Sequence, residues 1–371
     1  MSQMLVAIGA ARHLPADLYL DLGPLHPAGQ GAMQLELEVE GDVIAAADPR
    51  IGFVHRSAEK LFEARDYRQL MMLANRHDWV SAFSSELAIA LVLEDAMGIL
   101  TPERATWSRM LLAEMNRVTA GFIMLGAAAQ EFHYLLPHRE TLLELLEQLT
   151  GSRIHPMFNR IGGIARELSP QWLQSLNDVT TQLQEGLQEL PNEVAQHFAK
   201  FTGVGVISPE AIQLFGLSGT VAWASGVHND LRFTEPYLAY NAIQQLAPAP
   251  HQPGDVPARF TLIAEHLLFS LQIMSESIAW LQQAGSGPTS VQLPKVVRVP
   301  ELTTYGAIEG PLGTIGVLLD SIGEKTPSRL KLRTPAFATI QSFETTLIGV
   351  PLDALIPMLQ SCAYVVGDAD R

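Results

Sequence analysis

The sequence has little cysteine and little positive charge, and both deficits exclude classes of function. It contains a single cysteine, Cys362, in 371 residues. No disulfide framework can therefore form within the chain, and no thiolate cage for zinc or an iron–sulfur cluster can be built. We expect Cys362 to be a small buried side chain. Lys and Arg number 24 against 39 Asp and Glu, for a net charge of −15, and no basic run offers neutralisation of nucleic-acid phosphates.

Motifs of several enzyme classes are also missing. The chain has no Gly-x-Ser-x-Gly elbow, no His-Glu-x-x-His zinc motif, no Walker phosphate loop and no Gly-x-Gly-x-x-Gly after the first predicted strand. No signal peptide is evident. The most apolar long window, 110–129, contains Glu114, Asn116 and Arg117, whose cost in a bilayer argues against a membrane span. A reducing, cytoplasmic location fits these observations.

The hydrophobic pattern predicts one α+β domain over 1–371, with a central helical bundle flanked by β structure at both ends. Its parts are an N-terminal β region (15–55), a mainly helical region (56–290) and a C-terminal α+β region (291–371). Strict alternation predicts a strand at 34–40, and the turn signal at 40–42 predicts a returning strand.

Capping signals and periodicity predict the other elements. Gly98 is expected to end one helix, and Thr101 is expected to be the N-cap of the next, with proline and glutamate following it. Further helices are expected at 140–150, 171–190, 260–284, 336–345 and 352–361, separated by an irregular middle at 203–230. Strands are expected at 295–299, 305–309, 314–319 and 329–333.

Three polar segments are candidates for function. The loop 21–31 holds two prolines, three glycines and one imidazole, and it is either a rigid ligand grip or a tight β-turn. The run NRHDW (75–79) is either a helix-capping arrangement, with Asp78 as N-cap, or the polar wall of a cavity. In the run HRSAEK (55–60), Glu59 could pair with Arg56 or Lys60 at a solvated helix start.

Taken together, these motifs resemble one family. It is the D subunit of the proton-pumping NADH:quinone oxidoreductase, respiratory complex I, which is related to the large subunit of [NiFe] hydrogenases. The resemblance runs in the family's order from about residue 18 to the last residue, and it is nearest to a divergent second-copy form of that subunit. The motifs that carry it include GPLHP (23–27), HRSAEK (55–60), RHD (76–78), RIGG (160–163), ASGV (224–227), DLR (230–232), KLRTPAF (331–337) and GDADR (367–371). One cysteine cannot supply the thiolates of a nickel–iron centre, so the hydrogenase branch is set aside.

The resemblance implies a hydrogenase large-subunit-like fold and a quinone-binding cavity. It places the quinone between the loop around His26 and the start of the helical bundle. At the family's polar positions this chain departs from the pattern, with Gln30 in place of a histidine, Trp79 in place of a tyrosine and Glu131 in place of an aspartate. Trp223 stands where the family has an arginine. Gln30 and Trp79 can form hydrogen bonds but do not titrate near neutrality, which leaves His26, His77, Glu131 or water to deliver protons.

The resemblance also assigns roles outside the quinone contacts. Arg56 and Arg76 would lie near the electron-donating iron–sulfur cluster of a partner subunit, and His77 and Asp78 would form a possible proton relay. The chain itself would bind no metal or nucleotide, with the iron–sulfur clusters and FMN held by partners. Its neighbours would be the B, C, I and H subunits, at the cytoplasmic side of the cell membrane. Two alternatives remain open, a structural paralogue that does not reduce quinone at this site and a free-standing ligand-binding protein.

Overall fold

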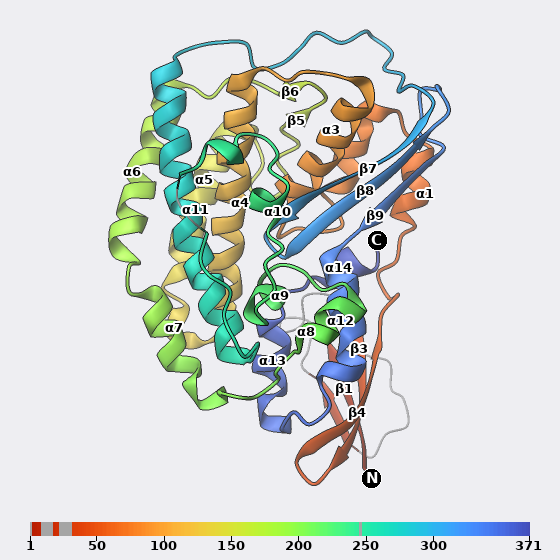
Figure 1. Ribbon diagram of the computed structural model, residues 1–371, viewed down its shortest axis with the longest axis vertical. Coiled ribbons are helices and arrows are strands. Elements are labelled where there is room, and N and C mark those ends of the chain that lie inside the picture. The colour runs from red at the N-terminus through yellow and green to blue at the C-terminus, as the bar shows by residue number, and fades with distance from the viewer. Residues whose placement is uncertain (1, 9–17, 22–31, 245–246) are drawn as a thin grey trace.

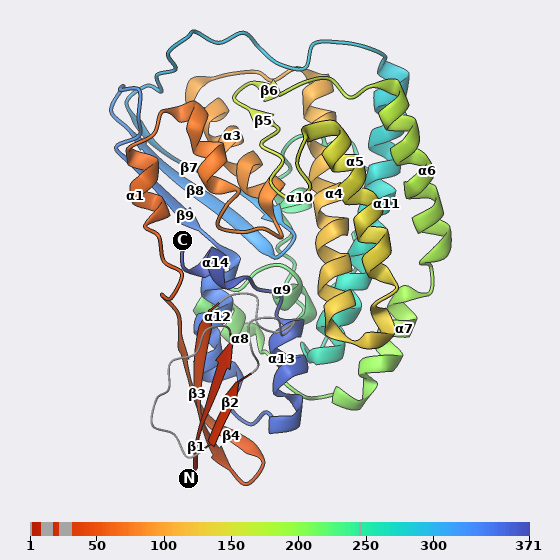
Figure 2. The same ribbon diagram turned by 180° about the vertical axis from the view of Figure 1, so that it is seen from behind.

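A helical bundle stands beside three small sheets in a computed structural model, which describes residues 2–8, 18–21, 32–244 and 247–371 (Figures 1 and 2). One sheet, built from the last strands of the chain, runs diagonally beside the bundle. The N-terminal sheet lies at one end of the molecule, where the chain begins. The predicted α+β fold, with a central bundle flanked by N- and C-terminal β structure, is confirmed.

The centre of the bundle is formed by its two longest helices, α4 (Glu103–Ala128) and α11 (Val256–Ala284), which pack against each other. They are surrounded by α5 (Leu135–Thr150), α6 (Pro170–Gly186) and α7 (Leu190–Phe198). Both central helices are buried on most sides, so their charged side chains must be paired inside the protein. Among the described residues, no helix combines the length and the hydropathy that crossing a bilayer requires.

The helix expected at 171–190 is two helices. The first ends at Gly186 and the second begins at Leu190, with proline in its first turn. Proline lacks the amide hydrogen that continuing the first helix would need. The irregular middle also contains short helices that the sequence pattern did not reveal, namely α8 (Pro209–Phe215), α9 (Thr220–Ala224) and α10 (Leu231–Thr234).

Thr101 does not cap α4, contrary to the prediction. The helix has Pro102 as its N-cap, and the Pro102 carbonyl accepts the amide of Thr106 at 3.0 Å. The Thr101 hydroxyl instead donates to the Glu94 carboxylate at 3.1 Å. Because Glu94 is a buried carboxylate, a hydrogen bond from the Thr101 hydroxyl to it is stronger than a hydrogen bond to the neutral backbone at a helix end.

Helix α3 (Ala82–Met97) lies between the bundle and the C-terminal sheet, and Gly98 ends it in the left-handed conformation, as predicted. Two short helices precede it, α1 (Ala58–Glu63) and α2 (Leu70–Ala74). Glu59 on α1 pairs with neither of the basic neighbours that were expected. Its carboxylate contacts Arg329 at 2.6 Å and Arg371 at 3.4 Å, so it ties the helix to the C-terminal region.

The C-terminal sheet is an antiparallel meander of β7 (Leu302–Gly310), β8 (Gly313–Ser321) and β9 (Arg329–Arg333). Its tight turn needs Gly313, whose φ is +131° and whose added Cβ would lie 2.7 Å from the Ser218 hydroxyl. The strand expected at 295–299 does not form. That segment is irregular, although Val297 and Val299 are buried. The alternation of its apolar residues therefore reflects burial of side chains in the core and not pairing with another strand. The chain closes with α12 (Pro335–Thr346), α13 (Leu355–Ser361) and α14 (Val366–Ala369).

The N-terminal sheet has the strand order β2-β1-β3-β4. Its strands are β1 (Ser2–Ile8), β2 (Leu18–Asp21), β3 (Met33–Glu40) and β4 (Val43–Arg50). The predicted hairpin of β3 and β4 is confirmed, with Leu35, Leu37 and Val39 buried on one face. Two two-residue strands, β5 (Asn159–Arg160) and β6 (Gly163–Ile164), form a small ribbon beside α3.

Candidate functional site

The segment 75–79, between α2 and α3, turns consecutive side chains to different surroundings. Arg76 is exposed, His77 and Asp78 are buried, and Trp79 is half-buried. An irregular segment can do this because no helix or strand period fixes where its side chains point. The segment therefore contributes to an outer charged surface, to a buried acid–imidazole cluster and to the wall of a cavity.

The outer surface brings Arg56 and Arg76 together. The Arg56 guanidinium donates to the backbone carbonyl of Arg76 at 3.3 Å, and Arg76 reaches the sulfur of Met157 at 3.9 Å. His155 lies beside this pair, and its pKa is lowered by burial first and by the charge of Arg76 second. His155 was not predicted from the sequence, although it shortly precedes the Arg160–Gly163 motif that carried the resemblance.

A hollow of about 560 Å³ is lined in part by Met157, the residue whose sulfur Arg76 contacts. Its lining is rich in sulfur and includes Met71, Met72 and Met157, with Arg68 and Arg160 as its charged members. Methionine packs adaptably against other surfaces. The hollow and the arginine pair together form an exposed face with both apolar and cationic character.

Glu86 on α3 holds this face in place. Its carboxylate accepts the Asn75 side-chain amide at 2.6 Å and the backbone amides of Met157, Phe158 and Asn159 at 2.6, 3.0 and 3.2 Å. The side chain is fully buried, and burial is the main cause that raises its pKa. A single carboxylate thus fixes the segment that carries Arg76 against the segment that carries His155.

A second carboxylate of α3 fixes the other end of the same loop. Glu94 forms a bidentate pair with Arg109 of α4, at 2.6 and 2.8 Å, and also accepts the amide of Gly162 at 2.6 Å. Arg109 is completely buried and donates to the carbonyls of Arg160 and Gly163. The Arg160–Gly163 turn is therefore held by a buried ion pair between two helices.

The buried part of the segment is an acid–imidazole cluster. His77 Nδ1 lies 2.9 Å from an oxygen of Asp368, near the C-terminus, and neither side chain is exposed by more than a few per cent. His77 Nε2 and Asp78 Oδ2 are buried without a hydrogen-bond partner in the described residues. Burial, followed by the charge of Asp368, raises the pKa of Asp78 to about 6.

Asp78 also shapes the start of α3. Its Oδ1 accepts the backbone amides of Val80 and Ser81 at 2.9 and 3.0 Å. The N-cap of α3 is Ser81, so Asp78 closes the turn before the helix and does not cap it directly. Asp78 as N-cap, one of the two alternatives posed by the sequence, is therefore wrong, whereas the neighbouring Trp79 does line a cavity.

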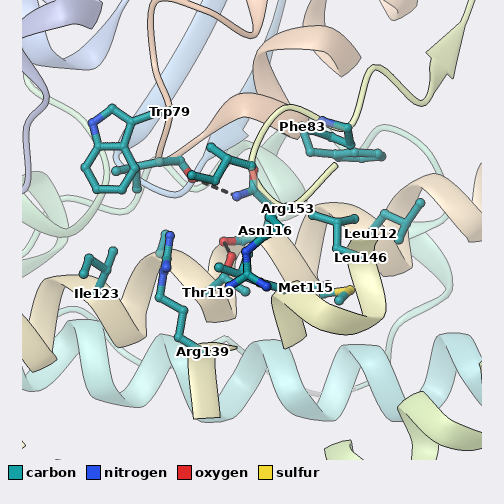
Figure 3. Close-up of a pocket in the computed structure, with 15 residues that line it drawn as sticks. Trp79, Phe83, Leu112, Met115, Asn116, Thr119, Ile123, Arg139, Leu146 and Arg153 are labelled. Carbon is teal, nitrogen blue, oxygen red and sulfur yellow. Dashed lines mark hydrogen bonds between the residues drawn. The ribbon is translucent and has the colours of Figure 1, made fainter. Parts of the chain in front are cut away.

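Trp79 lines a narrow cavity between α3, α4, α5 and the loop before β5, which we call the Trp79 cavity (Figure 3). Asn116 lies at its floor and donates to the Val80 carbonyl at 2.7 Å. Arg139 rises from α5 into the space below Trp79. Burial lowers the pKa of Arg139, and its Nε is buried with no partner in the described part of the chain. The cavity volume is about 30 Å³, which accommodates water and little more.

The other proposed quinone contacts are His26, Gln30 and Glu131. His26 and Gln30 fall outside the described residues. Glu131 lies in the short turn Gln130–Phe132 after α4, with its side chain 65% exposed and its carboxylate 3.9 Å from His197. Glu131 is not among the described residues that line the Trp79 cavity, whereas Ile123, two turns earlier on α4, is.

A buried ionic network lies deeper in the bundle. Arg232 is fully buried and contacts both Glu114, at 3.1 Å, and Asp230, at 2.7 Å, while Tyr240 donates to Glu114 at 2.5 Å. Burial raises the pKa of Glu309, at the edge of this network, to about 8. These groups compensate one another's charge and link α4 to α10 and to the neighbouring strand.

The described residues contain no cluster of three or more His, Cys, Asp or Glu side chains that could hold a metal ion. Cys362 is buried as predicted, and burial raises the pKa of its thiol. A buried thiol of raised pKa is a poor ligand and a poor nucleophile.

Comparison with known proteins gives a consistent result over the whole chain. Residues 125–297 and 289–371 match the family described as "Respiratory-chain NADH dehydrogenase, 49 Kd subunit". The chain is 41% identical to the D 2 subunit of the NADH-quinone oxidoreductase of Salinispora arenicola, over 100% of this chain and 98% of that protein. It is 41% identical to the D 1 subunit from Streptomyces coelicolor (99% and 98% covered) and 32% identical to the D subunit from Geobacillus thermodenitrificans (95% and 98%).

Proposed function

Because the chain belongs to the 49 kDa subunit family of the respiratory-chain NADH dehydrogenase, we propose that it forms part of the quinone-binding cavity of a proton-translocating NADH:quinone oxidoreductase. The observation that carries the proposal is the arrangement of residues 75–79. Within five residues the chain presents an exposed arginine, a buried acid–imidazole cluster and an aromatic cavity wall. Reduction of a quinone needs an electron donor on one side and a proton supply on the other, and this segment adjoins a candidate for each.

Arg56 and Arg76 are proposed to face the iron–sulfur cluster of a partner subunit. Both are exposed and held together by the Arg56 hydrogen bond to the Arg76 carbonyl. Their fixed positive charge would favour the reduced cluster, because reduction adds negative charge nearby. The sulfur-lined hollow beside them is suited to the apolar surface of such a partner.

His26 and Gln30 are proposed to line one side of the quinone headgroup, with Trp79 opposite and Glu131 behind. The Trp79 N–H and the Gln30 amide would orient the quinone oxygens but cannot supply protons near neutral pH. Forming a quinol takes two electrons and two protons. His77 and Asp78 directly precede Trp79, His77 is paired with the buried Asp368, and two polar atoms of this cluster have no partner in the described residues. We propose this cluster as the proton relay.

The chain is further proposed to assemble with the B, C, I and H subunits, on the cytoplasmic side of the cell membrane, with FMN and the iron–sulfur clusters held by partner subunits. Its single domain, 1–371, would act only as part of that assembly. The names of its relatives support an oxidoreductase subunit, and the family resemblance supports these more specific assignments.

A second function is favoured by one observation, the small Trp79 cavity. Its volume of about 30 Å³ is below that of a quinone ring. Together with the non-titrating Gln30 and Trp79, this supports a structural paralogue that helps to assemble the complex without reducing quinone at this site.

Photolabelling separates the two functions. The purified complex is irradiated with a short-chain azido-quinone, and the labelled peptides of this chain are identified by mass spectrometry. The first function predicts labelling of the peptide that contains Trp79, and competition by excess unmodified quinone. A matched complex with Trp79→Phe, which keeps the ring, should still be labelled. Absence of competed label from this chain would support the structural role.

A further inference from the structure

A second cavity is lined by residues other than those of the Trp79 cavity. Its volume is about 330 Å³. Its walls come from α9, α10, α11 and the loop 247–250. A volume of this size is in the range of small-molecule sites. We call it the Trp223–His266 cavity after the two aromatic side chains that line it.

Trp223 and His266 form a rigid pair. Their rings are stacked, with centroids 4.2 Å apart and planes 23° from parallel. Trp223 is 4% exposed and His266 is 5% exposed. The Trp223 N–H donates to the Asn229 side chain at 3.0 Å, which fixes the orientation of its ring. The cavity therefore has one preformed wall whose side chains lose no freedom when a ligand binds.

The protonation of His266 follows from its partner. Nη2 of Arg232 lies 3.1 Å from His266 Nδ1, and because a guanidinium only donates, Nδ1 must accept. The ring proton is therefore on Nε2. Burial and then the charge of Arg232 hold the pKa of His266 well below its usual value, so the ring is neutral. Nε2 has no hydrogen-bond partner in the described residues.

The remaining walls define the ligand that fits. Phe233, Pro248 and Pro250 supply apolar surface, with two alanines between and beside the prolines. The one carboxylate in the lining, Asp230, is already neutralised by three contacts with Arg232. An anionic ligand would lie beside the Asp230 carboxylate, with the exposed His228 as the other ionisable side chain of the lining besides His266, and a cationic ligand would find that carboxylate already paired. A neutral, largely apolar ligand has neither cost.

We propose that the Trp223–His266 cavity binds a neutral ring compound that carries a carbonyl group, which accepts a hydrogen bond from His266 Nε2. The apolar walls hold the ring, and the imidazole N–H selects the carbonyl. This binding needs no redox chemistry and is independent of the proposed quinone cavity.

A matched pair of small ligands tests the proposal. The bicyclic ketone 1-indanone and the hydrocarbon indane have the same ring shape and differ by the carbonyl. Binding to the purified complex in lipid nanodiscs is measured by saturation-transfer NMR, with empty nanodiscs as the blank. One hydrogen bond to a buried donor predicts that indanone binds about threefold to tenfold more tightly than indane.

Two variants locate the effect. Thr234 is exposed at the mouth of the cavity, so Thr234→Trp should block entry and weaken both ligands at least about tenfold. His266→Phe keeps a ring against Trp223 but removes the N–H, so indanone and indane should bind equally. Equal affinities in the native complex, or undiminished binding in the Thr234→Trp complex, would overturn the proposal.

Discussion

The two oxygens of the Asp78 carboxyl group have different roles. One oxygen organises the turn before α3 through the Val80 and Ser81 amides, and the other is buried beside His77 and Asp368 without a partner in the described residues. Burial and the negative charge of Asp368 raise its pKa to about 6. Near neutral pH the carboxyl can therefore exchange a proton while its structural oxygen keeps the turn closed.

The raised pKa predicts a pH dependence of local stability. An unfolded Asp titrates near pH 3.9. A carboxyl whose pKa is raised by folding stabilises the native state below that value, and the stabilisation is lost as pH rises through about 6. Hydrogen exchange of residues 77–83 in the assembled complex, corrected for intrinsic rates, should show protection falling between about pH 4.5 and 6.5. In the Asp78→Asn variant, which keeps the acceptor oxygen, protection should not change over this pH range. The same fall of protection with pH in the native and variant complexes would contradict the prediction.

At the scale of elements, α3 is the support of the site. Glu86 near its start holds segments 75–76 and 157–159 together, and Glu94 near its end holds the Arg160–Gly163 turn through Arg109. Both carboxylates are buried, so each stabilises the loop only while its donors remain in place. The segments that carry Arg76 and His155 are thus positioned by α3.

Breaking the Glu94–Arg109 pair should loosen that turn. Arg109→Met leaves Glu94 buried without its cation, at a cost of about 3–5 kcal/mol. The measurement is the opening free energy of residues 159–164 from hydrogen exchange in the complex. The double variant Arg109→Met with Glu94→Gln removes the uncompensated charge and should recover at least about 1 kcal/mol. A double variant no more stable than the single one would show that the charge is not the cause.

Much of the element layout is predictable from local sequence. The alternation at 34–40, the stop at Gly98 and the buried Cys362 follow from short-range pattern, and the structure confirms them. The failures come from tertiary contacts, made or missing, that a local sequence pattern does not reveal. Thr101 bonds Glu94 instead of capping α4, and segment 295–299 alternates without a neighbouring strand.

The site is less predictable than the fold for the same reason. Arg56, Arg76 and the 77–79 run could be singled out because they stand close in sequence or within a recognised motif. Glu86 and His155 could not, because their importance rests on contacts with residues about 70 to 80 positions away. His155 had one usable signal, its place shortly before the Arg160–Gly163 motif.

At the scale of the whole molecule, the family resemblance is confirmed by the full-length similarity to D subunits of NADH-quinone oxidoreductases, including second copies. The chain carries 15 more acidic than basic side chains, yet Arg56 and Arg76 place two positive charges together on its surface. At an interface of low dielectric constant, these charges can shift the reduction potential of a neighbouring redox centre.

Removing the arginine charges should lower the reduction potential of the partner's cluster. Arg56→Gln and Arg76→Gln should each lower the midpoint by tens of millivolts, since about 1 kcal/mol of lost charge interaction corresponds to roughly 40 mV for one electron. Redox titration followed by electron paramagnetic resonance measures this. Arg298→Gln, at a surface ion pair with Glu324, is the charge-matched control and should cause no shift. Equal midpoint potentials in all complexes would show that the arginine pair does not act on the iron–sulfur cluster.

The central claim is that residues of this chain line a working quinone site, and the most direct test is quinone reduction by the assembled complex with Gln30→Ala and Trp79→Ala. Each variant should lower the NADH:quinone rate at least about tenfold or raise the quinone KM by a similar factor. NADH:ferricyanide activity, which takes electrons before the quinone step, should be unchanged. Unchanged quinone kinetics in both variants would contradict the account.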